Sequence, residues 1–342
     1  MALPISRKKL KNKLSLTYTS DEQPGFFRKK RGKGFQYLDE ENQKIDCSKS
    51  LKRIQQLVIP PMWKQVWICK KDNGHLQSTG RDLRKRKQYI YHPDWLAYRQ
   101  EQKFSKMLEF AKALPTLRRT TEKHLKQKRW NRKKVLALAV KILDEHHIRI
   151  GNKQYAKSNG TFGLTTLRRK HIELENGELS FSYKAKSNKY RNVSIDNPRL
   201  VKLIKQCSEL PGYEVLRYQD EDDNMQSVDS SDVNEYLQEV MGDEFTSKDF
   251  RTWAGTSLAV KFYKDAVDFL EANPKKKLEP TLVKMVSKKL GNTLSVCREY
   301  YIHPCVLDLV KNNKVKINSK TKDSRWMEAY EKETIKILKK YC

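Results

Sequence analysis

The spacing of apolar residues changes along the chain and predicts two kinds of structure. From residue 34 to about residue 91, apolar residues come in short, strand-like pieces separated by turn signals, at 35–37, 66–69, 75–77 and 88–91. After His92 and Pro93, apolar residues recur at helical spacing. We therefore expect an α+β protein, with a small β-rich N-terminal domain at 34–95 and a larger, mainly helical domain at 96–342.

Residues 1–33 show little periodicity and carry ten basic side chains. They predict a mobile basic arm that precedes the first domain. A charge run alone does not distinguish an arm that touches phosphate from a tail that only keeps the protein soluble, so both interpretations stay open.

Two expected helices bring an arginine to the edge of an apolar face. The first helix leads into Arg149, in the sequence Arg-Ile-Gly-Asn, and its stripe is Val135, Leu138, Ala139, Ile142 and Leu143. The second helix buries Phe250, Trp253 and Ala254 and carries Arg251 beside them. Each arginine would then rest on a rigid base. Arg251 could equally be an edge residue whose stem covers apolar surface.

Residues 171–186 give the clearest hairpin pattern in the sequence. Two runs of alternating apolar residues flank Asn176-Gly177, a pair that suits a type I′ turn. A second turn at 186–189 leads into a strand at 190–195 and places Lys186 at an exposed tip. Most lysines at such tips only increase solubility.

The stretch from 291 to 304 reads Gly-Asn-Thr-Leu-Ser-Val-Cys-Arg-Glu-Tyr-Tyr-Ile-His-Pro. Gly291 can end one helix and Thr293 can cap the next, so that Tyr300 and Tyr301 lie about two turns into it. Asn292 lies near the same end of the structure. Tyrosines at helical spacing are usually core residues, and only the rest of the chain gives these a chemical role.

The net charge of the chain narrows the range of functions that it could have. The chain has 71 Lys and Arg against 41 Asp and Glu, a net charge of +30, with 37% hydrophobic and 10% aromatic residues. This composition fits a folded protein whose surface is adapted to a polyanion. Nucleic acid is the first candidate for that polyanion, and an acidic membrane is the second. No apolar run approaches the ~20 residues of a spanning helix, and we expect a cytoplasmic protein.

Two basic segments are candidate DNA contacts. Residues 81–87 hold five basic side chains, ending at Lys87, and are followed by Gln88, Tyr89 and Tyr91. Cations there could sit on phosphate while the amide reads a base edge, but a solvated basic turn fits about equally well. Residues 118–134 hold nine basic residues and one acidic one, a second candidate phosphate track.

The six cysteines are widely scattered and form no Cys-x-x-Cys pair. Free thiols in a reducing compartment explain them best, and neither a disulfide framework nor a zinc site is indicated. His146 and His147 are adjacent, so on a helix they point in different directions. We assign no metal and no cofactor.

Together, the candidate site residues are two arginines, a lysine, an amide and a tyrosine. This set contains no carboxylate pair and no Gly-rich phosphate loop. It suits a phosphodiester attacked by an oxygen nucleophile, because guanidinium groups neutralise charge on the nonbridging oxygens without a metal. Tyrosine can serve as nucleophile and leaving group, and lysine as the acid for the departing oxygen.

From residue 34 on, the chain resembles the type IB DNA topoisomerases, most closely the small bacterial form related to the poxvirus enzyme. The resemblance rests on Arg-Ile-Gly-Asn at 149, Tyr-Lys-Ala-Lys at 183, Lys-Asp-Phe-Arg-Thr at 248 and Gly-Asn-Thr-x-x-Val-Cys-Arg-x-x-Tyr-Ile-His-Pro at 291. It implies a catalytic fold shared with tyrosine recombinases and two domains that clamp duplex DNA.

The resemblance also implies roles. Tyr301 would be the nucleophile, Arg149 and Arg251 the phosphate clamps and Lys186 the general acid. Asn292 stands where the poxvirus and nuclear enzymes have histidine, and would still donate to a nonbridging oxygen. The motif register favours Tyr301 over the neighbouring phenol. Lys87, Gln88, Tyr89 and Tyr91 match the family's Lys-Gln-Tyr-x-Tyr stretch, which touches DNA near the cleavage site.

The expected function is relaxation of positive and negative supercoils through a 3′-phosphotyrosyl intermediate, without ATP or metal, by a monomer associated with a bacterial nucleoid or encoded by a large DNA virus. One alternative is a tyrosine recombinase, although the chain has Lys248 three residues before Arg251 where recombinases usually have histidine. The other is an architectural DNA-binding protein, which leaves the tyrosine and arginine spacings unexplained.

Overall fold

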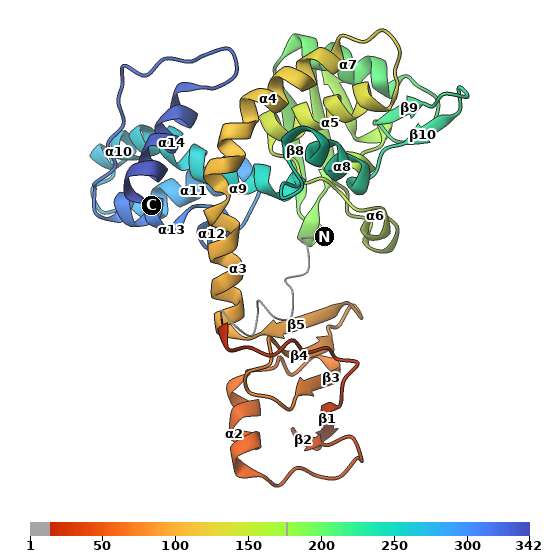
Figure 1. The fold of residues 1–342 in the computed structure, drawn as a ribbon, viewed down its shortest axis with the longest axis vertical. Helices are drawn as coiled ribbons and strands as arrows, with labels where there is room; N and C mark the ends of the chain where they lie inside the picture. Colours follow the sequence, from red (N-terminus) through yellow and green to blue (C-terminus); the bar gives the residue numbers. More distant parts are fainter. Residues whose placement is uncertain (1–13, 176) are drawn as a thin grey trace. The chain divides into compact units, whose positions relative to one another are not determined.

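The computed structural model describes residues 14–175 and 177–342. The chain forms two compact units that divide between Lys103 and Phe104 (Figure 1). The division falls inside helix α3 (Pro93–Ser105), eight residues beyond the boundary expected after residue 95. The first turns of α3 belong to the first unit because Trp95 packs edge-on against His75, with ring centroids 5.2 Å apart.

The first unit is a five-stranded antiparallel sheet with one helix beside it. Its elements are β1 (Gly25–Arg31), β2 (Gly34–Leu38), α2 (Ser48–Gln56), β3 (Lys64–Cys69), β4 (Leu76–Arg81) and β5 (Lys87–Tyr91). The strand order is β2-β1-β3-β4-β5. Ile54 of α2 packs on Val66 and Ile68 of β3. The β-rich domain expected from the sequence is confirmed, and each of the four predicted strand pieces lies in β2, β3, β4 or β5, apart from His75, which directly precedes β4.

The prediction of a basic arm over 1–33 is wrong for its last part. Gly25–Arg31 form β1, which pairs with both β2 and β3. Arg28 fixes the strand by donating hydrogen bonds to the carbonyls of Ile59, Pro60 and Trp63, at 3.0, 2.8 and 2.9 Å. A charged side chain is held here because three backbone acceptors surround it. Residues 1–13 of the expected arm lie outside the described residues.

The second unit is mainly helical. Its helices are α4 (Met107–Leu125), α5 (Arg132–His146), α6 (Lys153–Asn159), α7 (Pro198–Ser208), α8 (Ser230–Met241), α9 (Ser247–Lys261), α10 (Tyr263–Glu271), α11 (Leu278–Leu290), α12 (Leu294–Tyr300), α13 (Pro304–Lys311) and α14 (Ala329–Tyr341). Short 3-10 helices are η1 (Leu164–Thr166), η2 (Arg169–His171) and η3 (Lys186–Asn188). Within 14–175 and 177–342, no helix has the length and apolar character needed to cross a membrane.

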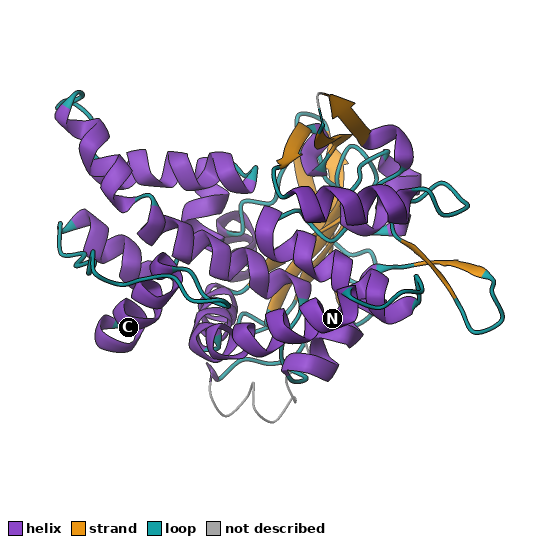
Figure 2. Cartoon of the chain, turned by 90° about the horizontal axis from the view of Figure 1, so that it is seen from above, coloured by secondary structure: helices purple, strands orange, loops and turns teal. Residues whose placement is uncertain are grey.

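Two small antiparallel sheets complete the second unit (Figure 2). They consist of β6 (Ile172–Glu175), β7 (Glu178–Lys184) and β8 (Tyr190–Ile195), and of β9 (Arg217–Gln219) and β10 (Met225–Ser227). The β6-β7 hairpin is confirmed, and its inward residues Leu179 and Phe181 are fully buried. Asn176 of the predicted turn lies outside the described residues.

Helix α9 lies in the middle of the second unit's core. Every residue from Asp249 to Val260 is buried, and the helix packs on α4, α11 and α14. A helix enclosed on all sides can hold a functional side chain in one position, because its neighbours leave no room for movement. Arg251 occupies such a position.

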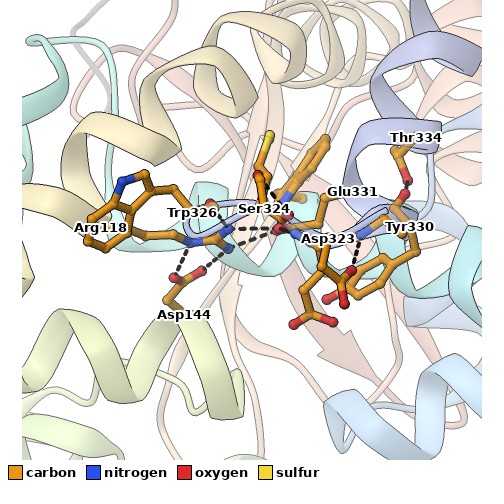
Figure 3. A network of polar contacts seen from close by, with 12 residues as sticks. Arg118, Asp144, Asp323, Ser324, Trp326, Tyr330, Glu331 and Thr334 are labelled. Carbon is orange, nitrogen blue, oxygen red and sulfur yellow. Dashed lines mark hydrogen bonds and ion pairs between the residues drawn. The ribbon is translucent and has the colours of Figure 1, made fainter. Parts of the chain in front are cut away.

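A buried polar network fixes α4, α5, α9 and α14 to one another (Figure 3). Arg118 bonds Asp144 and Glu331, both at 2.7 Å, and Trp253 donates from its indole nitrogen to Glu331 at 3.1 Å. Burial alone would lower the pKa of Arg118, but the two carboxylates outweigh it and raise that pKa. Arg118 therefore does not belong to the expected phosphate track, and neither does Lys134, which is buried and donates to the Gln127 carbonyl at 2.7 Å.

Cys305 and Cys342 form a disulfide, with their Cα atoms 5.8 Å apart. The expectation that all six cysteines are free is therefore wrong for this pair, and the remaining four are free thiols. The pairing joins the start of α13 to the end of α14 across a sequence separation of 37 residues. Sequence spacing gave no sign of it because the two helices become neighbours only in the folded unit. Loop-closure entropy assigns such a link about 4 kcal/mol of stabilisation.

Candidate active site

Two arginines and one asparagine from separate parts of the second unit meet at a single oxygen. Asn292 Oδ1 accepts hydrogen bonds from Arg149 Nη2 and from Arg251 Nη2, the latter at 3.0 Å. Arg149 Nη1 also reaches the Gly291 carbonyl at 3.4 Å. The structure thus places together three of the residues that the sequence singled out. We refer to Arg149, Arg251 and Asn292 as the guanidinium cluster.

The Arg-Ile-Gly-Asn motif holds Arg149 through its backbone. Helix α5 ends at His146, and His147 turns the chain with a left-handed φ of 53°. The Arg149 carbonyl then accepts from the Leu164 amide at 2.8 Å. Gly163 packs so closely that a Cβ there would lie 2.6 Å from the same carbonyl oxygen. These contacts fix the direction in which the Arg149 side chain leaves the backbone.

Arg251 is enclosed and almost fully engaged. Its side chain is 5% exposed, and it donates to the His147 carbonyl and, at 3.0 Å, to the Leu290 carbonyl. Arg251 Nε and Asn292 Nδ2 are buried nitrogens that have no hydrogen-bond acceptor among the described residues. Leaving two buried donors unpaired is costly. The site is therefore suited to an anionic ligand with several acceptor oxygens.

Tyr301 lies against this cluster. The Arg251 guanidinium carbon is 5.1 Å from the Tyr301 ring centroid. The Thr256 hydroxyl donates to the Tyr301 carbonyl at 3.3 Å, and a Cβ on Gly255 would lie 2.3 Å from that carbonyl oxygen. Two residues of α9 thus hold the Tyr301 backbone directly against the helix that carries Arg251.

The structure separates the two neighbouring tyrosines more clearly than a helix would. Helix α12 begins after Thr293, whose hydroxyl caps it as predicted, but it ends at Tyr300. Tyr301 is the residue that follows, with φ −127° and ψ −24°, so it is not two turns inside a helix as expected. Tyr300 is 41% exposed, and its hydrogen bond with Glu299 raises its pKa. Tyr301 is the phenol beside the guanidinium cluster.

The two arginines of the guanidinium cluster repel each other because their positive charges lie close together. Burial first, and repulsion from Arg251 second, lower the pKa of Arg149 to about 10. Arg149 still carries its charge at neutral pH. The cluster consequently presents two positive charges in a partly dry site, where attraction for a phosphate is stronger than in water.

The other predicted site residues lie on other elements. Lys186 is exposed on η3, and among the described residues no hydrogen bond joins it to the guanidinium cluster. The remaining candidates lie on β5 of the first unit. Lys87 pairs with Asp21 at 2.6 Å and Gln88 donates to Asp82 at 3.0 Å.

Tyr89 and Tyr91 share one face of β5. Their rings stack with centroids 5.9 Å apart, and Tyr89 is 47% exposed. Exposed aromatic rings beside basic residues suit a nucleic-acid surface.

Sequence reasoning missed Arg191 on β8. It treated residues 190–195 only as a strand, but Arg191 alternates with Val193 and Ile195, which face the core. An arginine at an inward position of a strand was the available signal. The side chain reaches the end of α11 next to the guanidinium cluster.

One group of described residues could hold a metal ion, namely His303, Cys305 and Cys342, whose donor atoms lie within 4.8 Å of one another. Thiolates are the form of cysteine that binds metal. Since the two cysteines are joined in a disulfide, they offer no thiolate.

His147 should make the second unit sensitive to acid. Burial first, then repulsion from Arg251, Lys289, His146 and Arg191, lower its pKa to about 3. The folded protein thus binds fewer protons than the unfolded chain between pH 3 and the unfolded value near 6.5, so stability is full above 6.5 and falls below it. Between pH 7 and pH 5 we expect His147 to remove about 2 kcal/mol from the free energy of unfolding.

Urea unfolding of the full chain at pH 7 and pH 5 measures this loss. His147→Asn is the matched variant, because asparagine tolerates the left-handed conformation and does not titrate. We expect the variant to lose less stability than the wild type over this interval by about the amount assigned to His147. Equal losses in the two proteins would show that His147 is not the responsible group.

Two family models match the chain. A model described as the catalytic core of eukaryotic DNA topoisomerase I matches residues 85–329, and one described as the N-terminal domain of bacterial DNA topoisomerase IB matches residues 34–82.

Among individual proteins, the DNA topoisomerase 1B of Acanthamoeba polyphaga mimivirus is 29% identical over 296 residues, covering 84% of this chain and 88% of the relative. That of Vaccinia virus (strain Copenhagen) is 23% identical over 264 residues, covering 76% and 80%. A solved structure of the XerH site-specific recombinase bound to its difH substrate matches with 19% identity and a TM-score of 0.35, over 55% of this chain and 48% of that one.

Proposed function

The chain belongs to the type IB DNA topoisomerase family, and we propose that it cleaves and rejoins DNA at the guanidinium cluster with Tyr301 as the nucleophile. A DNA topoisomerase of this type is an isomerase, and DNA is its substrate.

The observation that carries the proposal is the pair of unpaired buried donors beside the Tyr301 ring. Arg251 Nε and Asn292 Nδ2 have no acceptor among the described residues, and the Arg149 and Arg251 guanidiniums converge with them on one oxygen. A phosphodiester supplies two nonbridging oxygens with acceptor positions for such donors. When a fifth oxygen approaches phosphorus, charge accumulates on those two oxygens, and donors already in place stabilise it.

The reaction proceeds by exchange of one phosphorus–oxygen bond for another. The Tyr301 oxygen attacks the scissile phosphorus as its phenolic proton leaves to water, and the bond to the 5′ oxygen breaks. This gives a 3′-phosphotyrosyl enzyme and a 5′-hydroxyl, which requires one proton. The nicked strand turns about its intact partner, driven by torsional strain, and the hydroxyl then reverses the step. Because the covalent link conserves the bond energy, the cycle consumes no ATP.

Lys186 is the proposed donor of the proton to the 5′ oxygen. The support for this role is the Tyr-Lys-Ala-Lys motif at 183 and the lysine's exposed position on η3. A lysine ammonium group is a suitable general acid for a departing alkoxide, and its exposed position leaves it accessible to bound DNA.

We further propose that the two units clamp duplex DNA, with Lys87, Gln88, Tyr89 and Tyr91 in contact near the cleaved bond. The net charge of +30 supports binding to a polyanion. One chain supplies all the proposed groups, so a monomer is sufficient. The proposed location is the cytoplasm, in association with the nucleoid if the source is a bacterium, or viral if a large DNA virus encodes the chain.

Relaxation of supercoiled plasmid in EDTA without ATP tests this function. We expect both positively and negatively supercoiled plasmids to be relaxed, because strand rotation follows whichever torque is present. Failure to relax either sign, with DNA binding intact, would contradict the proposal. Cleavage confined to a paired recombination site would favour the recombinase alternative instead.

A further inference from the structure

Arg191 holds the end of helix α11 immediately before Asn292. Its Nη1 donates to the Leu290 carbonyl at 3.0 Å and its Nη2 donates to the Lys289 carbonyl at 3.1 Å. The Leu290 carbonyl also accepts from Arg251 Nη2 at 3.0 Å. One backbone oxygen is therefore shared by a guanidinium of the proposed cluster and by one that has no assigned role.

The end of a helix is a favourable place for these cations. The last carbonyls of a helix have no partner within it, and they form the negative end of the helix dipole. Burial first, and then repulsion from Arg251 and Arg191, lower the pKa of Arg149. The hydrogen bonds of all three arginines to the carbonyls of residues 289–291 show how closely the charges are placed. The carbonyls of Lys289, Leu290 and Gly291 offset that repulsion, since each accepts from one or two of the arginines.

Gly291 fits this arrangement in two ways. Its φ of +62° is a left-handed conformation that ends α11 and turns the chain toward Asn292. A Cβ added there would lie 3.1 Å from the Nε, Cζ and Nη1 atoms of Arg191. The Arg191 guanidinium thus rests against the bare glycine, and any side chain would push the two apart.

We propose that Arg191 is a positioning residue for the DNA-cleavage reaction, an inference that rests on the function proposed above. It anchors the turn from α11 to α12, and so places the Asn292 amide and orients the Leu290 carbonyl that holds Arg251. Arg191 acts through hydrogen bonds to backbone oxygens, not through charge on the phosphate. Neutral donors at position 191 should therefore preserve much of its effect.

Three substitutions separate these two kinds of action. Arg191→Ala removes both bonds, Arg191→Gln keeps a neutral N–H donor, and Arg191→Lys keeps the charge and a donor. Under single-turnover conditions, with enzyme in excess over supercoiled plasmid, we expect the alanine variant to relax DNA ~10 to 100-fold more slowly, as a misplaced catalytic group does. Gln and Lys variants should stay within about tenfold of the wild type.

The apparent affinity for plasmid provides the second readout. Loss of a positioning residue lowers the rate at saturating DNA, but it leaves the half-saturating DNA concentration within about threefold of the wild-type value. Arg199→Ala serves as the control. It removes the same charge from an exposed residue of α7 that pairs with Glu122. Wild-type relaxation in the same assay tests the proposed function independently, so the variants are compared with an enzyme already known to be active.

Two results would overturn the inference. One is an alanine variant within threefold of the wild type. The other is a glutamine variant that is as slow as the alanine variant while the lysine variant stays active. That pattern would show that Arg191 acts through its charge. If the alanine variant melts below the assay temperature, the comparison of glutamine with lysine decides alone, since both keep a donor toward the Lys289 and Leu290 carbonyls.

Discussion

Tyr301→Phe is expected to abolish relaxation, with a loss on the order of 10⁴-fold or more, because it removes the hydroxyl of the proposed covalent nucleophile and no phosphotyrosyl bond can then form. The ring itself should remain in place. Its backbone carbonyl is held by the Thr256 hydroxyl at 3.3 Å, and Gly255 leaves no room for it to shift. DNA binding should therefore persist while chemistry stops.

Tyr300→Phe is the matched control, because it removes the same hydroxyl one residue earlier. Tyr300 ends α12, is 41% exposed and has a pKa raised by Glu299, so it is poorly suited to attack. We expect this variant to relax plasmid within about threefold of the wild type, as surface substitutions usually do.

Denaturant trapping of the covalent protein–DNA complex measures the same step directly. The wild type and Tyr300→Phe should each leave protein attached to a 3′ end, and Tyr301→Phe should leave none. A trapped complex in Tyr301→Phe that disappears in Tyr300→Phe would transfer the nucleophile to Tyr300. Loss of DNA binding in Tyr301→Phe would leave its inactivity without a chemical interpretation, so a gel-shift measurement accompanies the assay.

The spacing of apolar residues along the sequence predicted those helices and strands that have one apolar face and one polar face. The β6-β7 hairpin follows the alternation that ends in Leu179 and Phe181, both fully buried. Strand β1 was missed because four of its seven residues are Arg or Lys, which resembles a charge run. Its place in the sheet depends on carbonyls that follow Arg28 by 31 to 35 residues. No local pattern contains that information.

The basic segment 118–134 shows that a run of charged residues, too, contains no information about distant partners. Arg118 was counted as a phosphate contact, but its partners Asp144 and Glu331 lie 26 and 213 residues further along the chain. A side chain becomes structural when distant acids surround it, and only the fold reveals them. For the candidate site, sequence motifs singled out Arg149, Arg251 and Asn292, and the fold brings these three side chains together. They gave no indication of Arg191, whose partners are backbone atoms.

Arg251→Ala is expected to slow the cleavage step by about 10²- to 10³-fold, comparable to the loss of an oxyanion donor. Arg251 brings a charge and the unpaired Nε donor to the place where the nonbridging oxygens would lie. It also donates to Asn292 Oδ1 at 3.0 Å, so its removal affects the orientation of a second donor. Binding of DNA should weaken much less than the rate, because Arg251 is one of 71 basic residues in a chain with a net charge of +30.

Two further variants make the result specific to position 251. Lys261→Ala removes a cation from the exposed end of the same helix, where its side chain is 47% exposed, and should leave the rate within about threefold. Arg251→Lys retains the charge but cannot bridge the Leu290 carbonyl and Asn292 as the planar guanidinium does, so we expect it to recover only part of the loss. Because Arg251 is buried, thermal melting must show that each variant is folded at the assay temperature. A loss below tenfold in a folded Arg251→Ala enzyme would remove Arg251 from the group that stabilises the transition state.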